Sequence, residues 1–276
     1  MTIDMSQILD QLPPFSPSVK MLMQAMEADF VEPSKLETLL LSCPVISGRV
    51  LQISNSSFYG LSRQIESLRE AIVILGQGTL RGLIYTLSVI KNFEQAKGDE
   101  QNGFSFDVLW KHSLYSACLS RTLAEAHNED ASSLFTAALF QHLGLIVLNR
   151  VDEIAVREAV RVSQSEHRVL VESIYEHTGV NYIELSYQAL EYWHFPQDIC
   201  NAIRGIACVE NTQAVSLIKT STLVASAFNY PLINGLYLPP ISSAELQGVF
   251  PGSHFATKCI NEADILFEQL AKDILG

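Results

Sequence analysis

Two histidines and a neighbouring glutamine are the residues of this sequence whose types and spacing could do metal chemistry. His112 and His142 fall in separate predicted helices, and Gln141 directly precedes His142. Two imidazoles from facing helices could hold Zn²⁺ if a further donor approached them. The candidates for that donor are Glu172, Glu176 and His177. Nothing in the sequence places them there, so we expect His112 and His142 to be partly buried imidazoles that find hydrogen bonds, in a polar pocket with Gln141 and without metal.

A second candidate site is the polar and aromatic run that begins at Asn55. Asn55, Ser56, Phe58 and Tyr59 could form an interaction loop for a partner. The same residue types also end helices and anchor turns, because Asn and Ser bond to nearby backbone groups while Phe and Tyr bury aromatic surface. We favour the structural role and keep the loop as a candidate interaction site.

Other reaction chemistries find no support in the sequence. No Gly-x-Ser-x-Gly nucleophile motif occurs, so serine hydrolysis is not predicted. The five cysteines are odd in number and include no Cys-x-x-Cys pair, which fits neither a disulfide framework nor a zinc knuckle. We therefore expect a reducing, cytoplasmic location and no cofactor.

The charge balance argues against nucleic acid and acidic membranes as direct partners. The formal net charge is −12, and the 18 Lys and Arg residues are scattered singly along the chain. No Lys or Arg precedes Lys20, so no basic, cleavable leader is expected. The longest apolar stretch, Leu134–Leu148, is too short to cross a bilayer, and we expect it to be a buried core helix.

Hydrophobic periodicity throughout the chain predicts an all-α fold, and no segment alternates as a strand would. With 48% apolar and 17% charged residues, the 276-residue chain can bury a large core. Capping-box spacing at Ser34 and at Ser67 predicts two helix starts, and Gly76 predicts a helix break. Long helices are expected over 107–127, 130–149, 168–177, 181–194, 197–207, 212–229 and 254–274.

A composition shift over 96–103, rich in Gly and polar residues, predicts a boundary between two helical lobes. We expect an N-terminal lobe over 1–97 and a second lobe, with the C-terminal helices, over 104–276.

Several short motifs lie along both expected lobes. In the first lobe they are Leu12-Pro13-Pro14, Cys43-Pro44, Asn55-Ser56-Ser57-Phe58-Tyr59-Gly60 and Ile65-x-Ser67-Leu68. In the second they are Leu109-Trp110-x-His112-Ser113, Phe140-Gln141-His142-Leu143-Gly144, Thr178-Gly179-Val180 and Trp193-His194-Phe195-Pro196. Together, over about residues 12–230, they resemble the HDOD family of degenerate relatives of HD-domain phosphohydrolases. The resemblance implies a two-lobed helical bundle, an HD-like second lobe and a regulatory role in bacterial signal transduction.

The resemblance also implies that the HD metal ligands have been replaced. An active HD enzyme holds a divalent metal with a His, a later His-Asp pair and a further Asp, and the metal lowers the pKa of a bound water. Here the first His corresponds to His112, the pair to Gln141-His142, and the later Asp falls near Thr222. An amide and a hydroxyl supply too little charge and too few donors for that metal.

We therefore expect a non-catalytic signalling module that binds a protein partner or a small signalling ligand, through a groove between the lobes or the pocket at His112, Gln141 and His142. The alternative is a divergent metal-dependent phosphohydrolase or phosphodiesterase that acts on nucleotides or cyclic dinucleotides. A regulator that contacts DNA directly is a third possibility, which the scattered cations disfavour.

Overall fold

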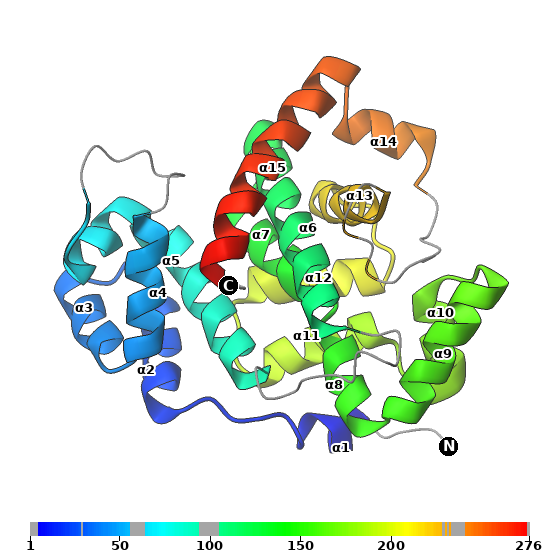
Figure 1. The fold of residues 1–276 in the computed structure, drawn as a ribbon, viewed down its shortest axis with the longest axis horizontal. Coiled ribbons are helices and arrows are strands. Elements are labelled where there is room, and N and C mark those ends of the chain that lie inside the picture. Colours follow the sequence, from blue (N-terminus) through cyan, green and yellow to red (C-terminus); the bar gives the residue numbers. More distant parts are fainter. Residues whose placement is uncertain are drawn as a thin grey trace. The chain divides into compact units, whose positions relative to one another are not determined.

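The computed structural model describes residues 5–28, 30–55, 64–93, 105–227, 230, 232 and 241–274. Every helix and loop discussed below belongs to this part of the chain, in which the regular elements are α-helices and no strand occurs (Figure 1). The predicted all-α class is confirmed. The expected boundary segment 96–103 lies outside the described residues.

Backbone contacts divide the chain into two compact units. The larger comprises Met1–Leu12 with Ala96–Asp264, and the smaller Pro13–Gln95 with Ile265–Gly276. This division differs from the expected lobes at both chain ends. At the N-terminal end the reason is that α1 (Met5–Leu9) packs on α8 (Leu143–Val151) and α11 (Tyr182–Tyr192). The two expected lobes, over 1–97 and 104–276, stay a prediction.

Besides the end of α15 (Ser253–Ile274), the smaller unit contains four complete helices with a shared core. They are α2 (Pro17–Met26), α3 (Pro33–Leu41), α4 (Pro44–Ser54) and α5 (Leu68–Phe93). The first three all begin with proline, whose fixed φ and missing N–H suit the first turn of a helix. The long helix α5 packs against the other three, and Leu22, Leu40 and Ile53 are fully buried. Apolar packing against α5 therefore holds this unit together.

The break predicted at Gly76 is confirmed within α5. Gly76 has φ 71° and ψ 159°, while the helix continues on both sides. An L-residue with a side chain is strained at this φ, so glycine is required there. The N-terminal end of α5 also carries the predicted cap, because the Ser67 hydroxyl accepts a hydrogen bond from the backbone N–H of Glu70 at 3.2 Å.

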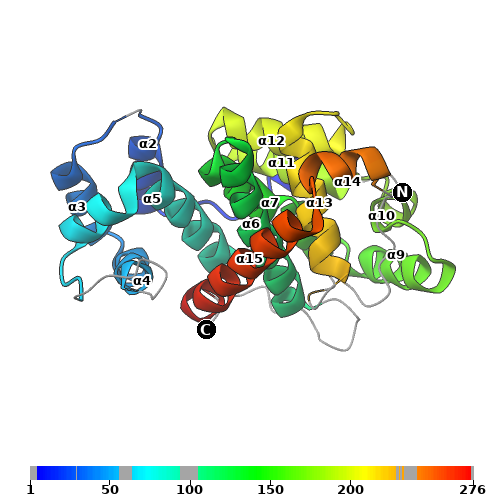
Figure 2. The ribbon, with the colours of Figure 1, turned by 90° about the horizontal axis from the view of Figure 1, so that it is seen from above.

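The larger unit contains α1, α8 and α11, described above, and further helices around a buried core. Its further helices are α6 (Phe106–His127), α7 (Ala131–Phe140), α9 (Glu153–Glu166), α10 (Leu170–Thr178), α12 (Gln197–Ala207), α13 (Gln213–Ala227), α14 (Ser243–Val249) and the start of α15 (Ser253–Ile274). Helix α6 packs against α7 and α13, which lie beside it in both views (Figures 1 and 2). On α7 the side chains from Ser133 to Phe140 are all buried, so this helix forms the centre of the unit.

The single helix expected over 130–149 is in fact two helices. Helix α7 ends at Phe140 and α8 begins at Leu143, with Gln141 and His142 between them. A close approach of α8 to α11 explains the difference. A Cβ atom on Gly144 would lie 2.0 Å from the carbonyl oxygen of Tyr182, and the Gly144 N–H donates to the Ser186 hydroxyl at 2.7 Å.

Two described stretches, Leu68–Ile90 and Ala131–Val151, are long and apolar enough to cross a membrane by length and composition alone. Within the fold, 61% of the first and 89% of the second is buried. Burial of this kind is typical of the core helices of a globular protein, and the second stretch contains the predicted core segment Leu134–Leu148.

Candidate functional site

The structure brings the predicted pocket residues together inside the larger unit. His112 lies on α6, and Gln141 and His142 occupy the break between α7 and α8. Their exposed fractions are 0%, 2% and 4%, and the ring centroids of the two histidines are 5.2 Å apart. The three side chains thus lie in a buried polar group, and the expectation that both imidazoles are only partly buried and hydrogen-bonded is wrong for His142.

The Gln141 amide is held in one orientation by two hydrogen bonds. Its Nε2 donates to the Ala138 carbonyl at 3.0 Å and to the Thr222 hydroxyl oxygen at 2.8 Å. Thr222 in turn donates to the Ile218 carbonyl at 2.9 Å. Because a backbone carbonyl can only accept, the nitrogen end of the amide must face it. Gln141 therefore presents donor hydrogens to this side, where a metal would need lone pairs.

His112 is fixed in one tautomer. Its Nδ1 donates to the Tyr230 carbonyl at 2.7 Å, which leaves Nε2 as an acceptor without a hydrogen-bond partner among the described residues. Burial lowers the pKa of His112 to about 4, and the Tyr230 hydrogen bond raises it in part. The ring is therefore neutral at pH 7.

His142 is the more isolated of the two imidazoles. In the described part of the chain, neither of its ring nitrogens has a hydrogen-bond partner, and the ring of Tyr182 lies 5.8 Å away, centroid to centroid. Burial, and then the neighbouring His112, lower the pKa of His142 well below its ordinary value. A neutral imidazole carries one N–H donor and one acceptor, so His142 holds an unused donor and an unused acceptor.

These residues do not fit a divalent metal. The described ranges contain no group of three or more His, Cys, Asp or Glu side chains that could hold one. The nitrogen of Gln141 and the hydroxyl of Thr222 are both engaged as donors, which leaves an uncharged set, the Gln141 amide oxygen and one ring nitrogen of each imidazole. Two of the third donors considered above are engaged elsewhere, since Glu176 pairs with Arg168 and His177 Nδ1 bonds to the Ser173 carbonyl at 2.8 Å.

A cavity of about 390 Å³ adjoins this polar group within the larger unit. Its polar lining is Gln141, His142, Asn181, Lys219, Thr222 and Glu245. Most of its wall is apolar and includes Val169, Leu170, Ile183, Ile206, Leu223 and Ile241. A mostly apolar concavity with a few convergent polar groups is the usual form of a small-molecule site.

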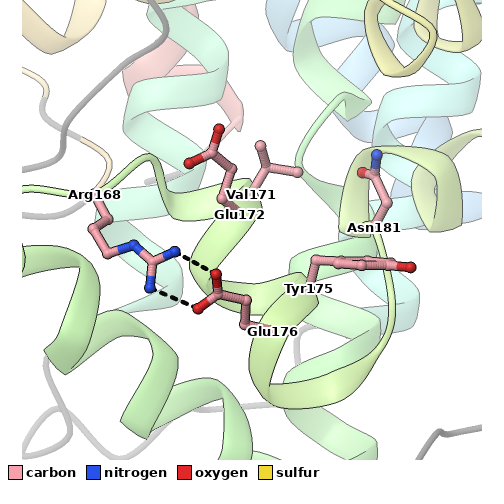
Figure 3. A pocket seen from close by; sticks show the side chains of 6 residues that line it. All are labelled: Arg168, Val171, Glu172, Tyr175, Glu176 and Asn181. Carbon is pink, nitrogen blue, oxygen red and sulfur yellow. Dashed lines mark hydrogen bonds and ion pairs between the residues drawn. The ribbon is translucent and has the colours of Figure 1, made fainter.

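An open groove of about 440 Å³ lies next to the cavity and shares two of its lining residues, Val171 and Asn181. Figure 3 shows the groove, with the guanidinium of Arg168 facing the carboxylate of Glu176 through two hydrogen bonds. Tyr175, which is exposed, lies on α10 together with Glu176. The groove and the cavity therefore adjoin at Val171 and Asn181.

The second predicted site lies mostly beyond what the structure describes. Ser56, Phe58 and Tyr59 are outside the described residues. Asn55 ends α4 and bonds to the backbone of Ile65, with Oδ1 accepting from its N–H at 2.7 Å and Nδ2 donating to its carbonyl at 2.9 Å. Asn55 thus has the structural role that we favoured, and the interaction loop stays a prediction.

The sequence pattern of the HDOD domain matches residues 12–207, which is more than half of the chain. The chain belongs to the HDOD domain family. Among curated proteins, no sequence matches this HDOD chain significantly.

Solved structures similar to this HDOD chain extend over nearly its whole length. An HDOD domain protein of unknown function from Geobacter sulfurreducens has 20% identity and a TM-score of 0.74, with 99% of each chain covered. A candidate phosphohydrolase from Shewanella amazonensis SB2B has 18% identity and a TM-score of 0.72, with 97% of this chain and 98% of that chain covered. A candidate signal transduction protein from Marinobacter aquaeolei VT8 has 15% identity and a TM-score of 0.70, with 100% of this chain and 62% of that chain covered. At these identities the likeness shows the fold.

The sequence analysis predicted neither the cavity nor the lysine, Lys219, that lines it. Lys219 lies on α13, where it is the only charged residue of an otherwise apolar and hydroxyl-rich helix. A lone lysine in such a helix is a signal that could have been noted. The convergence of Val169 and Ile241 on the same space carried no signal in the sequence, because they come from segments far apart in the chain.

Proposed function

We propose that this HDOD protein is a non-catalytic, cytoplasmic signal-transduction module that binds a small signalling ligand or a protein partner. Ligand occupancy, rather than turnover, would then be the signal that it passes on. The observation that carries the proposal is the hydrogen bond from the Gln141 amide to Thr222, because it joins two positions where the HD family has metal ligands.

The chemistry of these side chains supports the proposal. Metal-assisted hydrolysis needs anionic or lone-pair donors that hold the cation and lower the pKa of its bound water. At this site the amide donates, the hydroxyl donates, and the two imidazoles are buried and neutral. The cavity beside them offers an apolar wall, which suits binding better than hydrolysis of a charged phosphate ester.

The rival function is a metal-dependent phosphohydrolase. Two observations favour a phosphohydrolase. The candidate phosphohydrolase from Shewanella amazonensis SB2B has a similar fold, and His112 is retained.

One experiment separates the two functions. The purified chain is incubated with a cyclic dinucleotide and with p-nitrophenyl phosphate in the presence of Mn²⁺ or Mg²⁺, and its metal content is measured. We expect no turnover and less than about a tenth of an equivalent of bound metal. Turnover that His112→Ala abolishes would overturn the proposal, because it would require His112 to hold a catalytic cation.

A further inference from the structure

Two buried side chains of the cavity lining carry a polar atom that the protein leaves unused. Gln141 and Tyr182 both line the cavity, with exposed fractions of 2% and 4%. Among the described residues, the Gln141 oxygen Oε1 and the Tyr182 hydroxyl make no hydrogen bond. Neither is completely enclosed by protein, in contrast to both ring nitrogens of His142. The open surface of these two oxygens therefore lies at the cavity.

The Gln141 oxygen offers an acceptor that cannot be exchanged for a donor. Both hydrogens of Nε2 are used, one on the Ala138 carbonyl and one on the Thr222 hydroxyl oxygen, so the amide has no reason to turn over. The lone pairs of Oε1 stay open to the cavity. A ligand that contacts Gln141 here must donate a hydrogen bond to it.

The Tyr182 hydroxyl offers a donor to the same cavity. Burial raises the pKa of Tyr182, so the hydroxyl keeps its proton at pH 7. A buried O–H without an acceptor is costly, and a ligand oxygen would satisfy it. The ring of Tyr182 lies 5.8 Å from that of His142, centroid to centroid, and His142 follows Gln141 in the chain. The donor and the acceptor thus come from neighbouring parts of the wall.

The charges of the lining offset each other. Lys219 is the one cation of the described lining, and Glu245 is its one carboxylate. The hydroxyl and the N–H of Ser242, and after them Lys219, hold the pKa of Glu245 below its usual range, so Glu245 is ionised at pH 7. A charged ligand in this largely apolar cavity would lose its hydration without gaining a net counter-charge. The lining therefore suits an uncharged ligand.

We propose that the cavity binds a small, uncharged, mainly apolar carboxamide. Its N–H donates to Gln141 Oε1, and its carbonyl oxygen accepts from the Tyr182 hydroxyl. Its hydrocarbon part packs against the wall formed by Leu170, Ile206 and Leu223. Because Gln141 and Tyr182 belong to different helices, a donor and an acceptor on two separate atoms suit them better than the single oxygen of an alcohol. This inference rests on the proposed function, since it names the ligand class of the binding module.

Calorimetric titration of the full chain with five compounds of matched shape tests the proposal. They are 4-butylbenzamide, 4-butylacetophenone, 4-butylbenzyl alcohol, 4-butylbenzoate and 4-butylbenzamidine. We expect the amide to bind on the order of tenfold more tightly than the ketone, which accepts but cannot donate to Gln141. The alcohol should bind more weakly than the amide. The benzoate and the benzamidine should be weaker than the amide by about tenfold or more, because their charges are desolvated.

Matched variants assign the two hydrogen bonds. Tyr182→Phe removes only the unused hydroxyl, so it should weaken the amide and the ketone alike, by about five- to tenfold, with the melting temperature preserved. Tyr192→Phe alters an exposed tyrosine outside the cavity and should change neither affinity. Gln141→Met should abolish the preference for the amide over the ketone. Ala207→Phe fills the cavity and should weaken every compound.

The proposal is overturned by an amide that binds no more tightly than the ketone, the alcohol or the benzoate. Amide binding that neither Tyr182→Phe nor Ala207→Phe weakens also overturns it. Both results are available even where Gln141→Met, which gives up the bond to Thr222, does not fold.

Failure of this inference is distinct from failure of the proposed function. Absence of amide binding, without turnover, removes this ligand class and leaves the module non-catalytic. Metal-dependent turnover removes the proposed function whatever the titration shows.

Discussion

The side-chain nitrogen of Gln141 lies 2.8 Å from the hydroxyl oxygen of Thr222, across a sequence separation of 81 residues. The bond fastens the α7–α8 break to α13, and both residues line the cavity. The bond thus joins the two uncharged side chains on which the proposed non-catalytic function rests.

Removing the acceptor of this bond should destabilise the protein. Thr222→Val leaves the buried Gln141 amide without one partner, which costs about 1–2 kcal/mol of unfolding free energy. Thr220→Val is the matched control on the same helix, because the buried Thr220 hydroxyl has no hydrogen-bond partner among the described residues. That variant should be neutral or stabilising in urea denaturation. Equal losses for the two variants would contradict the role of the bond.

The close approach of α8 to α11 should make Gly144 intolerant of substitution. The added Cβ of Gly144→Ala would meet the Tyr182 carbonyl oxygen at 2.0 Å and the Ser186 nitrogen at 2.8 Å. Since both are backbone atoms, the helices must separate, at a cost of about 2–3 kcal/mol or more. Thermal unfolding followed by circular dichroism measures the loss.

Gly248→Ala provides the comparison in the same unit. Gly248 lies in α14 with nothing within 4 Å of an added Cβ, so its variant should be unchanged or stabilised by up to about 1 kcal/mol. A Gly144→Ala protein as stable as Gly248→Ala would refute the packing that the structure gives for α8.

Acid should destabilise the protein through its two buried imidazoles. The folded-state pKa values of His112, about 4, and of His142 lie below the value of 6.5 for a free imidazole. The unfolded chain therefore binds protons that the folded chain does not, so this stability is fully present above pH 6.5 and is lost as the pH falls toward 4. The loss is about 1.4 kcal/mol per pH unit for each histidine.

The variant His142→Leu should reduce that slope by about half, because one of the two protons is no longer taken up on unfolding. Urea titrations at a series of pH values between 4 and 7 measure the slope. A slope that does not change in the variant would show that His142 is not buried as a neutral group.

Restoring the HD ligands should restore metal binding. The triple variant Gln141→His, His142→Asp, Thr222→Asp, together with native His112, supplies two imidazoles and two carboxylates. We expect about one equivalent of Mn²⁺ or Zn²⁺ by elemental analysis, with a melting temperature that rises with metal concentration.

Adding His112→Ala to the triple variant is the control and should remove most of the bound metal. A folded triple variant that holds no more metal than the native protein would show that Thr222 is not the position of the last ligand.

Asn55 should be needed for stability rather than for recognition. Its side chain bonds to both backbone groups of Ile65 and also donates to the Leu51 carbonyl at 2.9 Å. We expect Asn55→Ala to lower the unfolding free energy by about 1–3 kcal/mol, and Asn55→Asp to lower it as well because the donor is lost. A change below about 0.5 kcal/mol would contradict the structural role.

Local signals in the sequence predicted many helix limits correctly. The helix expected over 197–207 is observed as Gln197–Ala207, since Pro196 excludes an earlier start and the apolar stripe continues to Ile206. The cap predicted at Ser34 was wrong. Pro33 starts α3, Glu32 is its N-cap, and Ser34 lies inside the helix. Helix α9 was missed, although Asp152 caps it and could have indicated its start.

Tertiary contacts account for what the sequence could not predict. The run 130–149 is apolar on every side, so its periodicity gave no reason to place a break at Gln141, which depends on the approach of α11 to Gly144. The resemblance to HDOD sequences assigned Gln141, His142 and a position near Thr222 to one site. The cavity did not, because Lys219 and Asn181 meet only in the folded chain.

The corner between α7 and α8 has a geometric consequence for the pair at its apex. In an uninterrupted helix, consecutive side chains project about 100° apart, so two neighbouring residues do not face the same cavity. The bend instead lets Gln141 and His142 both line the cavity. A mutation that straightened the chain here would therefore move one of the two side chains away from the cavity without replacing either residue.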